Sequence, residues 1–188
     1  MQFYQAFSFK SMVVYNRTVI SHKRFKKLLD FSYSAYQLKN IDNHTYRQEG
    51  KVPYFTHPLW CSLIFLNDAL IPIKLREIGY EALLLHDVLE DTSAKLPKWV
   101  SKKVMKLVSE MTFPSWKEEK KVLLSKPPFI KLLKLVDKLA SMYDLDVKPK
   151  NKKDWKKVTT ALLKDVEKEY GQIRVVQIGK GILKGTNW

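Results

Sequence analysis

The stretch ALLLHDVLEDT (residues 82–92) places four titratable side chains directly after three leucines. Buried ionisable groups are costly unless they are paired. In a continuous helix, residues four apart share a face, so we expect His86 above Glu90 and Asp87 above Asp91, all on one side. Imidazoles and carboxylates together bind divalent cations such as Mn²⁺, Fe²⁺ or Zn²⁺. The alternative is that these groups pair with each other or face water at a helix end.

Two further apolar segments each carry one such group. PYFTHPL (53–59) places His57 in the first turn of a helix, and KLLKLVDKLASMYD (131–144) places Asp137 among Leu, Val and Ala. Taken singly, each is explained by structure alone, and Lys134 or Lys138 can pair with Asp137. Together with the His86–Asp87 pair they form a set of two histidines and two aspartates on three apolar helices, which predicts a metal site.

The order His…His-Asp…Asp resembles that of the HD-domain metal-dependent phosphohydrolases. More closely, RQEGKVPYFTHP (47–58), ALLLHDVLEDT (82–92) and KLLKLVDKLASMYDL (131–145) resemble motifs of the hydrolase domain of the RelA/SpoT homologues. The resemblance runs from about residue 25 to about residue 170. Those enzymes, including small alarmone hydrolases, remove pyrophosphate from the 3′ position of (p)ppGpp, the alarmone of the stringent response.

The resemblance implies a role for each motif residue. The ligands of a single metal ion, usually Mn²⁺ in the family, correspond to His57, His86, Asp87 and Asp137. The imidazole and carboxylate set suits Fe²⁺ and Zn²⁺ as well. Glu90 and Asp91 match the catalytic acidic pair beside the nucleophilic water, where general acid–base catalysis contributes about 10²–10⁴-fold.

The implied substrate contacts are Arg47, Lys134 and Ser141, and here the chain departs from the family. Gln48 replaces a basic residue, the turn GKVPY is one residue longer than usual, and Ser141 replaces an Asn. Lys134 is implied to neutralise phosphate, unless it is a surface lysine with its ammonium group in water. The residues therefore predict phosphohydrolysis more firmly than they predict the alarmone.

Two alternative functions stay open. The same chemistry could act on another nucleotide or on 3′-pyrophosphorylated tRNA, as an antitoxin would. A catalytically weak nucleotide-binding protein is the other. Asp87→Asn separates them, because an enzyme would lose its function and a binding protein would keep part of it.

Composition adds a polyanion as a possible partner. The 188 residues carry a net charge of +15, with 34 Lys and Arg against 19 Asp and Glu. Only five of these cations are Arg, so a solvated lysine surface explains the charge as well as nucleic acid or tRNA does. The sequence contains no run of 18 apolar residues, so a membrane span is not predicted. The single cysteine, Cys61, forms no internal disulfide and suits a buried thiol in the cytoplasm. The oligomeric state is not indicated.

Hydrophobic periodicity predicts helices along most of the chain. Their expected ranges are 22–38, 57–70, 73–91, 98–111, 115–126, 129–145 and 155–171. We expect Pro97 to start the helix over 98–111. We therefore predict an all-α fold, a single HD-domain helical bundle over 22–171. Residues 1–21 would be an N-terminal extension. Residues 172–188 would be a C-terminal tail, either strand-like or loosely ordered.

Overall fold

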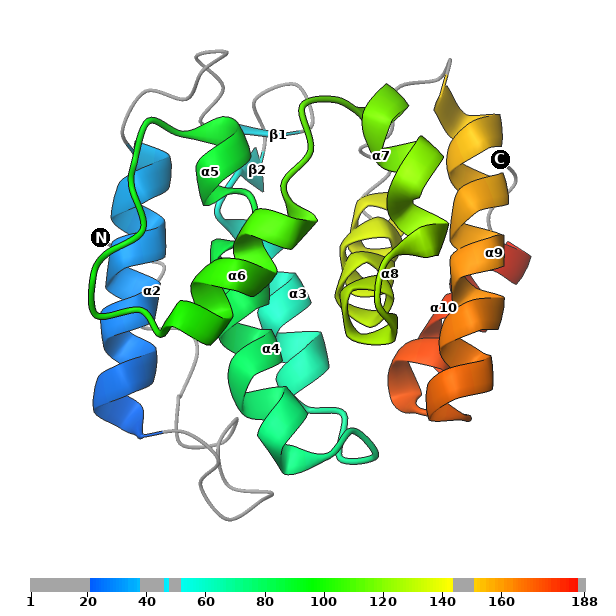
Figure 1. Cartoon of the computed structure of the whole chain (residues 1–188), viewed down its shortest axis with the longest axis horizontal. Helices are drawn as coiled ribbons and strands as arrows, with labels where there is room; N and C mark the ends of the chain where they lie inside the picture. Colours follow the sequence, from blue (N-terminus) through cyan, green and yellow to red (C-terminus); the bar gives the residue numbers. More distant parts are fainter. Residues whose placement is uncertain (1–20, 38–45, 48–51, 144–150, 186–188) are drawn as a thin grey trace.

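The computed structural model describes residues 21–37, 46–47, 52–143 and 151–185, and within them the protein is almost entirely helical (Figure 1). The helices are α2 (His22–Gln37), α3 (Thr56–Leu66), α4 (Ile73–Leu85), α5 (Val88–Asp91), α6 (Lys102–Met111), α7 (Trp116–Val122), α8 (Pro128–Tyr143), α9 (Lys152–Tyr170) and α10 (Arg174–Gly185). A 3₁₀ turn, η2 (Leu123–Ser125), follows α7. The strands β1 (Tyr46–Arg47) and β2 (Val52–Pro53) pair antiparallel. The predicted all-α fold is confirmed.

Helices α3, α4 and α8 form the centre of the bundle. Helix α4 packs against α3 and α6, and α8 packs against α3 and α9. In Figure 1, α2 closes the left side of the bundle and α9 and α10 close the right. Most side chains of α8 are buried, including Leu132, Leu133 and Leu135. A carboxylate or histidine on the inward face of α3, α4 or α8 therefore lies away from water. Among the described residues, none of the helices has the length and apolar character needed to cross a membrane.

Gly79 of α4 lies directly against the Phe65 ring of α3. A Cβ atom on Gly79 would lie 2.2 Å from Cε1 of Phe65, so a larger residue fits only if the ring or a helix shifts. Phe65 is fully buried and also contacts Phe129 of α8, with 6.2 Å between ring centroids. Gly79 thus leaves room for the Phe65 ring between the two helices.

The predicted continuous helix across residues 73–91 is wrong in one respect. Helix α4 ends at Leu85, His86 and Asp87 form a turn, and α5 begins at Val88. Asp87 has φ −88° and ψ −4°, in the bridge region next to the helical one. The amide of Asp91 still donates to the carbonyl of Asp87 at 2.9 Å. The apolar stripe continues through the turn, so periodicity does not reveal the interruption.

The predicted helix start at Pro97 is also corrected. Helix α6 begins at Lys102, and the Ser101 hydroxyl caps it by accepting a hydrogen bond from the Val104 amide at 3.2 Å. The Pro97 carbonyl instead accepts from the Val100 amide at 3.0 Å and closes a separate turn. A serine cap satisfies an amide of the first turn, which proline at this place does not do.

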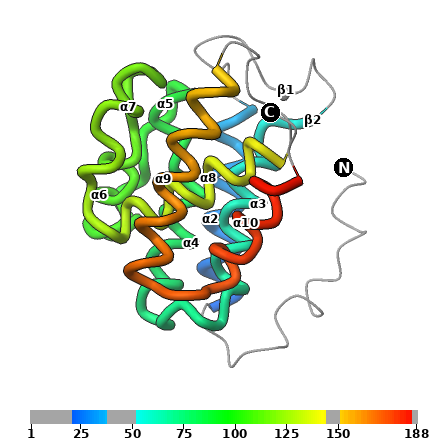
Figure 2. Tube along the Cα trace, turned by 90° about the vertical axis from the view of Figure 1, so that its right-hand side faces the viewer, coloured from blue at the N-terminus to red at the C-terminus, as the bar shows by residue number. Residues whose placement is uncertain are grey.

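The expectation of a strand-like or loosely ordered segment after residue 171 is wrong for residues 174–185. They form α10, which packs on α8 and α9 (Figure 2). Val175 and Val176 are buried, and the Val175 amide donates to Oδ2 of buried Asp68 at 2.9 Å. Gly171, with φ +70°, ends α9. The proposed N-terminal extension, 1–21, lies outside the described residues except for residue 21.

Candidate metal centre

Three segments far apart in the sequence bring the predicted metal ligands together. His57 lies in the first turn of α3, His86 at the end of α4, and Asp137 in the middle of α8. The Asp137 Oδ1 atom lies 3.2 Å from His57 Nε2 and 3.7 Å from His86 Nε2. One ligand atom from each residue lies within 4.8 Å of the others. All three side chains are buried, so the group can hold a metal ion away from bulk water.

Asp87 completes the predicted set from the turn between α4 and α5. Its Oδ1 atom lies 2.9 Å from His86 Nε2, and its Oδ2 atom lies 3.8 Å from His57 Nε2. Burial alone would raise the pKa of Asp87, but the two histidines lower it to about 2. The carboxylate is therefore ionised throughout the physiological range and faces both imidazoles.

The orientation of His86 fits a cation between these groups. Its Nδ1 atom lies 2.7 Å from the Leu83 carbonyl, which can only accept, so Nδ1 carries a proton. Nε2 is buried and makes no well-directed hydrogen bond, although it faces Asp87 and Asp137. Burial would lower the pKa of His86, but the two carboxylates raise it to about 10. The site thus favours a positive charge at Nε2, which either a proton or a metal ion supplies.

The other oxygen of Asp137 is held by lysines. Oδ2 lies 2.8 Å from Lys134 Nζ and 3.2 Å from Lys138 Nζ. Burial alone would raise the pKa of Asp137, but the two ammonium groups hold it well below its usual range. One oxygen therefore serves the lysines and the other faces the histidines.

Glu90 and Asp91 lie on α5 beside the metal ligands. The Oε1 atom of Glu90 accepts a hydrogen bond from the Phe113 amide at 2.6 Å. Asp91 is hydrogen-bonded to the side chain of Tyr54. Burial and the charge of Asp87 raise the pKa of both acids to about 7. At neutral pH each is divided between its acid and base forms, as a proton carrier requires.

The three predicted substrate contacts are placed differently. Ser141 is buried one turn after Asp137 on the same helix. Lys134 is only 2% exposed and is already paired with Asp137 and Glu119, at 2.9 Å from the latter, so it is no surface lysine. Arg47 belongs to β1, and its side chain lies outside what the structure describes. The roles of all three in substrate binding remain predictions.

Glu119 is a buried acid next to the candidate site that the sequence analysis missed. It lies on α7 within SWKEEKK, a segment whose other charged residues indicate a solvated helix. Its partners Lys134 and Lys138 lie on a different helix, at 2.9 and 2.7 Å. No local spacing links these segments, so only a three-dimensional structure could identify the contact.

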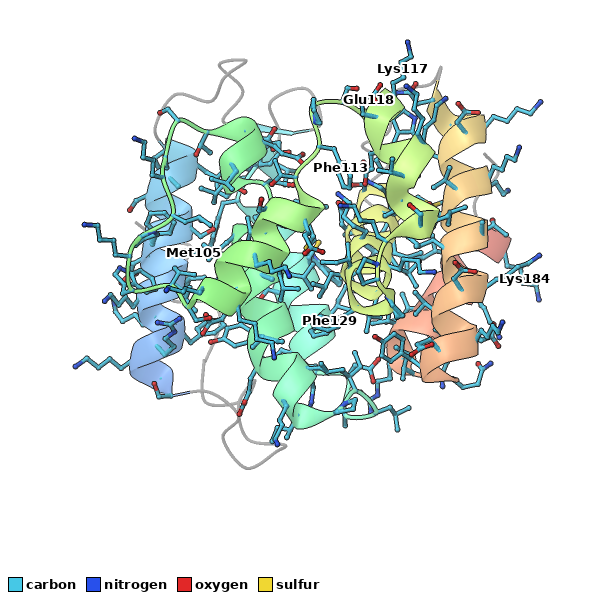
Figure 3. All side chains as sticks on the ribbon, viewed as in Figure 1. Met105, Phe113, Lys117, Glu118, Phe129 and Lys184 are labelled. Carbon is cyan, nitrogen blue, oxygen red and sulfur yellow. The ribbon has the colours of Figure 1, made fainter. Side chains whose placement is uncertain are left out.

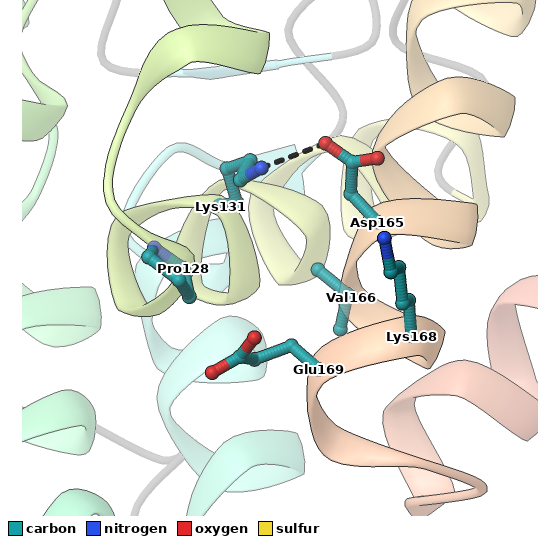
Figure 4. Close-up of a pocket in the computed structure, with 6 residues that line it drawn as sticks. All are labelled: Pro128, Lys131, Asp165, Val166, Lys168 and Glu169. Carbon is teal, nitrogen blue, oxygen red and sulfur yellow. Dashed lines mark hydrogen bonds and ion pairs between the residues drawn. The ribbon is translucent and has the colours of Figure 1, made fainter.

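A shallow groove lies elsewhere, between α8 and α9 (Figure 4). Its volume is about 210 Å³, and it shares no residue with the candidate metal centre. Lys131 and Asp165 form an ion pair of 2.7 Å at its edge. Because these opposite charges already satisfy each other, we assign no chemistry to the groove.

The architecture is the all-helical HD-domain fold. A similar solved structure is that of a metazoan ortholog of SpoT that hydrolyses ppGpp and plays a role in starvation responses. The two chains superpose with a TM-score of 0.68 over 89% of this chain and 97% of the other, at 23% sequence identity. No family model and no curated protein sequence matches the chain. The predicted fold is thus confirmed by a structure whose sequence has diverged widely.

Proposed function

We propose that this protein is a metal-dependent hydrolase that removes the 3′-pyrophosphate from (p)ppGpp. The observation that carries the proposal is the convergence of His57, His86, Asp87 and Asp137 from separate segments into one buried cluster. The ppGpp hydrolysis performed by the metazoan structural neighbour supports the substrate class. We place the reaction in the cytoplasm, where the buried thiol of the single cysteine, Cys61, stays reduced.

The donor set suits Mn²⁺, with Fe²⁺ and Zn²⁺ as alternatives. When bound, such an ion lowers the pKa of a water molecule and withdraws charge from a phosphate group. The proposed ligands are the two imidazole Nε2 atoms and the carboxylates of Asp87 and Asp137. Their burial excludes competing water from the cation side of the site.

Glu90 and Asp91 are the proposed proton carriers. With a pKa of about 7, the Glu90 carboxylate can accept a proton from the attacking water at neutral pH. The hydrogen bond from the Phe113 amide holds Oε1 in place, and this also orients the second carboxylate oxygen of Glu90. Asp91, held by Tyr54, can supply a proton to the leaving oxygen. The products are then GDP and pyrophosphate from ppGpp.

Three substrate contacts are proposed: Arg47 with the nucleotide, Ser141 with the nucleoside and Lys134 with a phosphate group. Because Gln48 and Ser141 depart from the family pattern, a second nucleotide substrate competes with the alarmone. The exposed lysines Lys153 and Lys157 on α9 favour a polyanion such as a 3′-pyrophosphorylated tRNA. Binding of such an RNA would weaken steeply with added salt, whereas binding of a small nucleotide would change less.

One assay tests the proposal and its competitors together. Metal-stripped protein reloaded with Mn²⁺ is offered ppGpp, GTP, NADPH and 3′-pyrophosphorylated tRNA, and products are separated by ion exchange. His86→Ala is the blank, and His22→Ala, at the exposed start of α2, is the matched control. We expect ppGpp to yield GDP and pyrophosphate in the wild type and the control only.

Other outcomes redirect the proposal. Cleavage of another compound with ppGpp intact keeps the phosphohydrolase and overturns the alarmone as substrate. If nothing is cleaved, nucleotide binding without catalysis replaces the enzyme.

A further inference from the structure

Four buried charges lie together on the lysine side of Asp137. Lys134 Nζ lies 2.8 Å from Asp137 Oδ2 and 2.9 Å from Glu119 Oε1. Lys138 Nζ lies 3.2 and 2.7 Å from the same two oxygens. Two ammonium groups thus alternate with two carboxylate oxygens, and we call these four residues the charge square. Each residue is between 2% and 6% exposed.

Glu119 reaches the square from α7, a helix with a polar surface. Its neighbours in the sequence are exposed: Lys117 and Glu118 project from the outer end of α7 (Figure 3). Glu119 is the buried residue of this helix. A carboxylate directed inward from a polar helix is retained only where it meets buried cations. The fold therefore brings this acid specifically to the two lysines.

Two tryptophans separate the square from water. Lys138 Nζ lies 4.4 Å from the ring centroid of Trp155 and 5.4 Å from that of Trp116. The two rings contact each other at 4.6 Å between centroids. With water excluded, charge interactions inside the square are much stronger than on the surface.

The charge balance of the square bears on the metal centre. Lys134 and Lys138 contribute two positive charges, while Asp137 and Glu119 contribute two negative ones. Without Glu119, the Asp137 carboxylate would be the partner left to balance both ammonium groups. The same carboxylate also faces the two histidines. With Glu119 present the square is neutral, and Asp137 Oδ1 can face His57 and His86.

We propose that Glu119 is a positioning residue of the metal centre. By neutralising Lys134 and Lys138, it keeps the negative charge of Asp137 available to a divalent cation on the histidine side. Glu119 acts through the lysines, as an outer partner that tunes a ligand. This inference rests on the metal site proposed above and assigns a role to a residue outside its motifs.

Calorimetric titration of metal-stripped protein with MnCl₂ tests the role directly. We expect Glu119→Gln to weaken Mn²⁺ binding by about 10–100-fold, the usual effect of losing an outer partner. Glu118→Gln is the matched control, because it removes a neighbouring exposed charge that pairs with Lys121 at 2.8 Å. Its Mn²⁺ affinity should change less than about threefold, as for other exposed pairs. Circular dichroism and melting in EDTA establish that each variant is folded.

The direction in which Mn²⁺ affinity changes in two further variants separates charge balance from a purely structural role. Lys138→Met removes a positive charge, so Mn²⁺ should bind as tightly as in the wild type or tighter. The double variant E119Q/K138M restores neutrality, and its affinity should return to within about threefold of the wild type, a difference of under 1 kcal/mol. These two variants carry the test if E119Q alone does not fold.

Three results would count against the inference. Unchanged Mn²⁺ affinity in a folded E119Q variant overturns it while leaving the metal site intact. Weakening by K138M as large as that by E119Q shows that the square only supports the fold. A wild type that binds no Mn²⁺ overturns the proposed metal site first, and the role of Glu119 with it.

Discussion

A part-buried ion pair and the candidate metal centre differ in how completely their charges are paired. Arg24 of α2 meets Glu81 of α4 through two hydrogen bonds, Nε to Oε1 at 2.8 Å and Nη2 to Oε2 at 2.7 Å. Its remaining nitrogen, Nη1, donates to the Trp99 carbonyl at 3.1 Å. Every charged atom of the pair therefore has a partner within the fold, and the pair joins α2 to α4.

The charges of the candidate metal centre are balanced less completely. Burial and, after it, the charge of Asp87 raise the pKa of Glu90 and Asp91 to about 7. Acids that repel one another in a buried place are unfavourable for folding and useful for binding a cation. The difference is that the Arg24 pair is satisfied within the fold, whereas the acids beside Asp87 are left to be balanced by a cation.

The largest expected effect is on catalysis. Asp87→Asn keeps the shape of the side chain but removes the charge that faces both imidazoles, so we expect ppGpp hydrolysis to fall more than about 100-fold. Initial rates with saturating Mn²⁺ measure it. Asp165→Asn, at a half-exposed acid paired with Lys131, is the control. Activity of D87N within threefold of the wild type would remove Asp87 from the site.

The second effect is on stability and concerns the Arg24 pair. Glu81→Gln leaves the guanidinium without its ionised partner, and we expect the free energy of unfolding to fall by about 1–3 kcal/mol. Urea denaturation measures the loss. The rate of ppGpp hydrolysis per folded molecule, assayed without denaturant, should stay unchanged. A loss of activity with no loss of stability would reverse the comparison between the two groups.

The third effect depends on pH. Glu90 has an ordinary pKa of 4.5 and a folded pKa of about 7, so the folded protein holds a proton that the unfolded chain releases between these values. The free energy of unfolding of the metal-free protein therefore falls as pH rises from 4.5 to 7, and this loss of stability is complete above pH 7. Glu90→Gln should therefore raise the melting temperature in EDTA at pH 8 and leave it unchanged near pH 4. A stabilisation present only at the lower pH would contradict the assigned pKa direction.

The smallest effect belongs to an exposed ion pair. Lys26 and Asp30 lie one turn apart on α2, 2.6 Å from each other, and both side chains are more than half exposed. Lys26→Met should change the free energy of unfolding by less than about 1 kcal/mol, because water screens such pairs. If Lys26→Met lowered the free energy of unfolding as much as Glu81→Gln does, the short distance between the charges would matter more for stability than their burial.

The grouping of His57, His86 and Asp137 could be predicted from the sequence because these residues lie in apolar segments. His57 and Asp137 are separated by 80 residues, yet each is an ionisable group in a largely buried, apolar segment, so their convergence can be inferred. The interruption at His86–Asp87 could not be inferred, because apolar residues continue on both sides of the turn. Cys61 is buried, as predicted.

Features made by contacts between distant segments escaped prediction. Val175 and Val176 favour strands by local propensity, but packing of α10 on the core overrides it. Gly179 permits this packing, since a Cβ there would lie 2.9 Å from Cδ1 of Leu163. Glu119 was missed for the same reason, because its partners are two lysines of another helix.

The close packing at Gly79 also bears on the two histidines. His57 and His86 lie on α3 and at the end of α4, with 5.4 Å between their ring centroids. A Cβ at residue 79 would meet the Phe65 ring between the same two helices. A substitution at Gly79 would therefore disturb the packing of the two helices that carry the imidazoles.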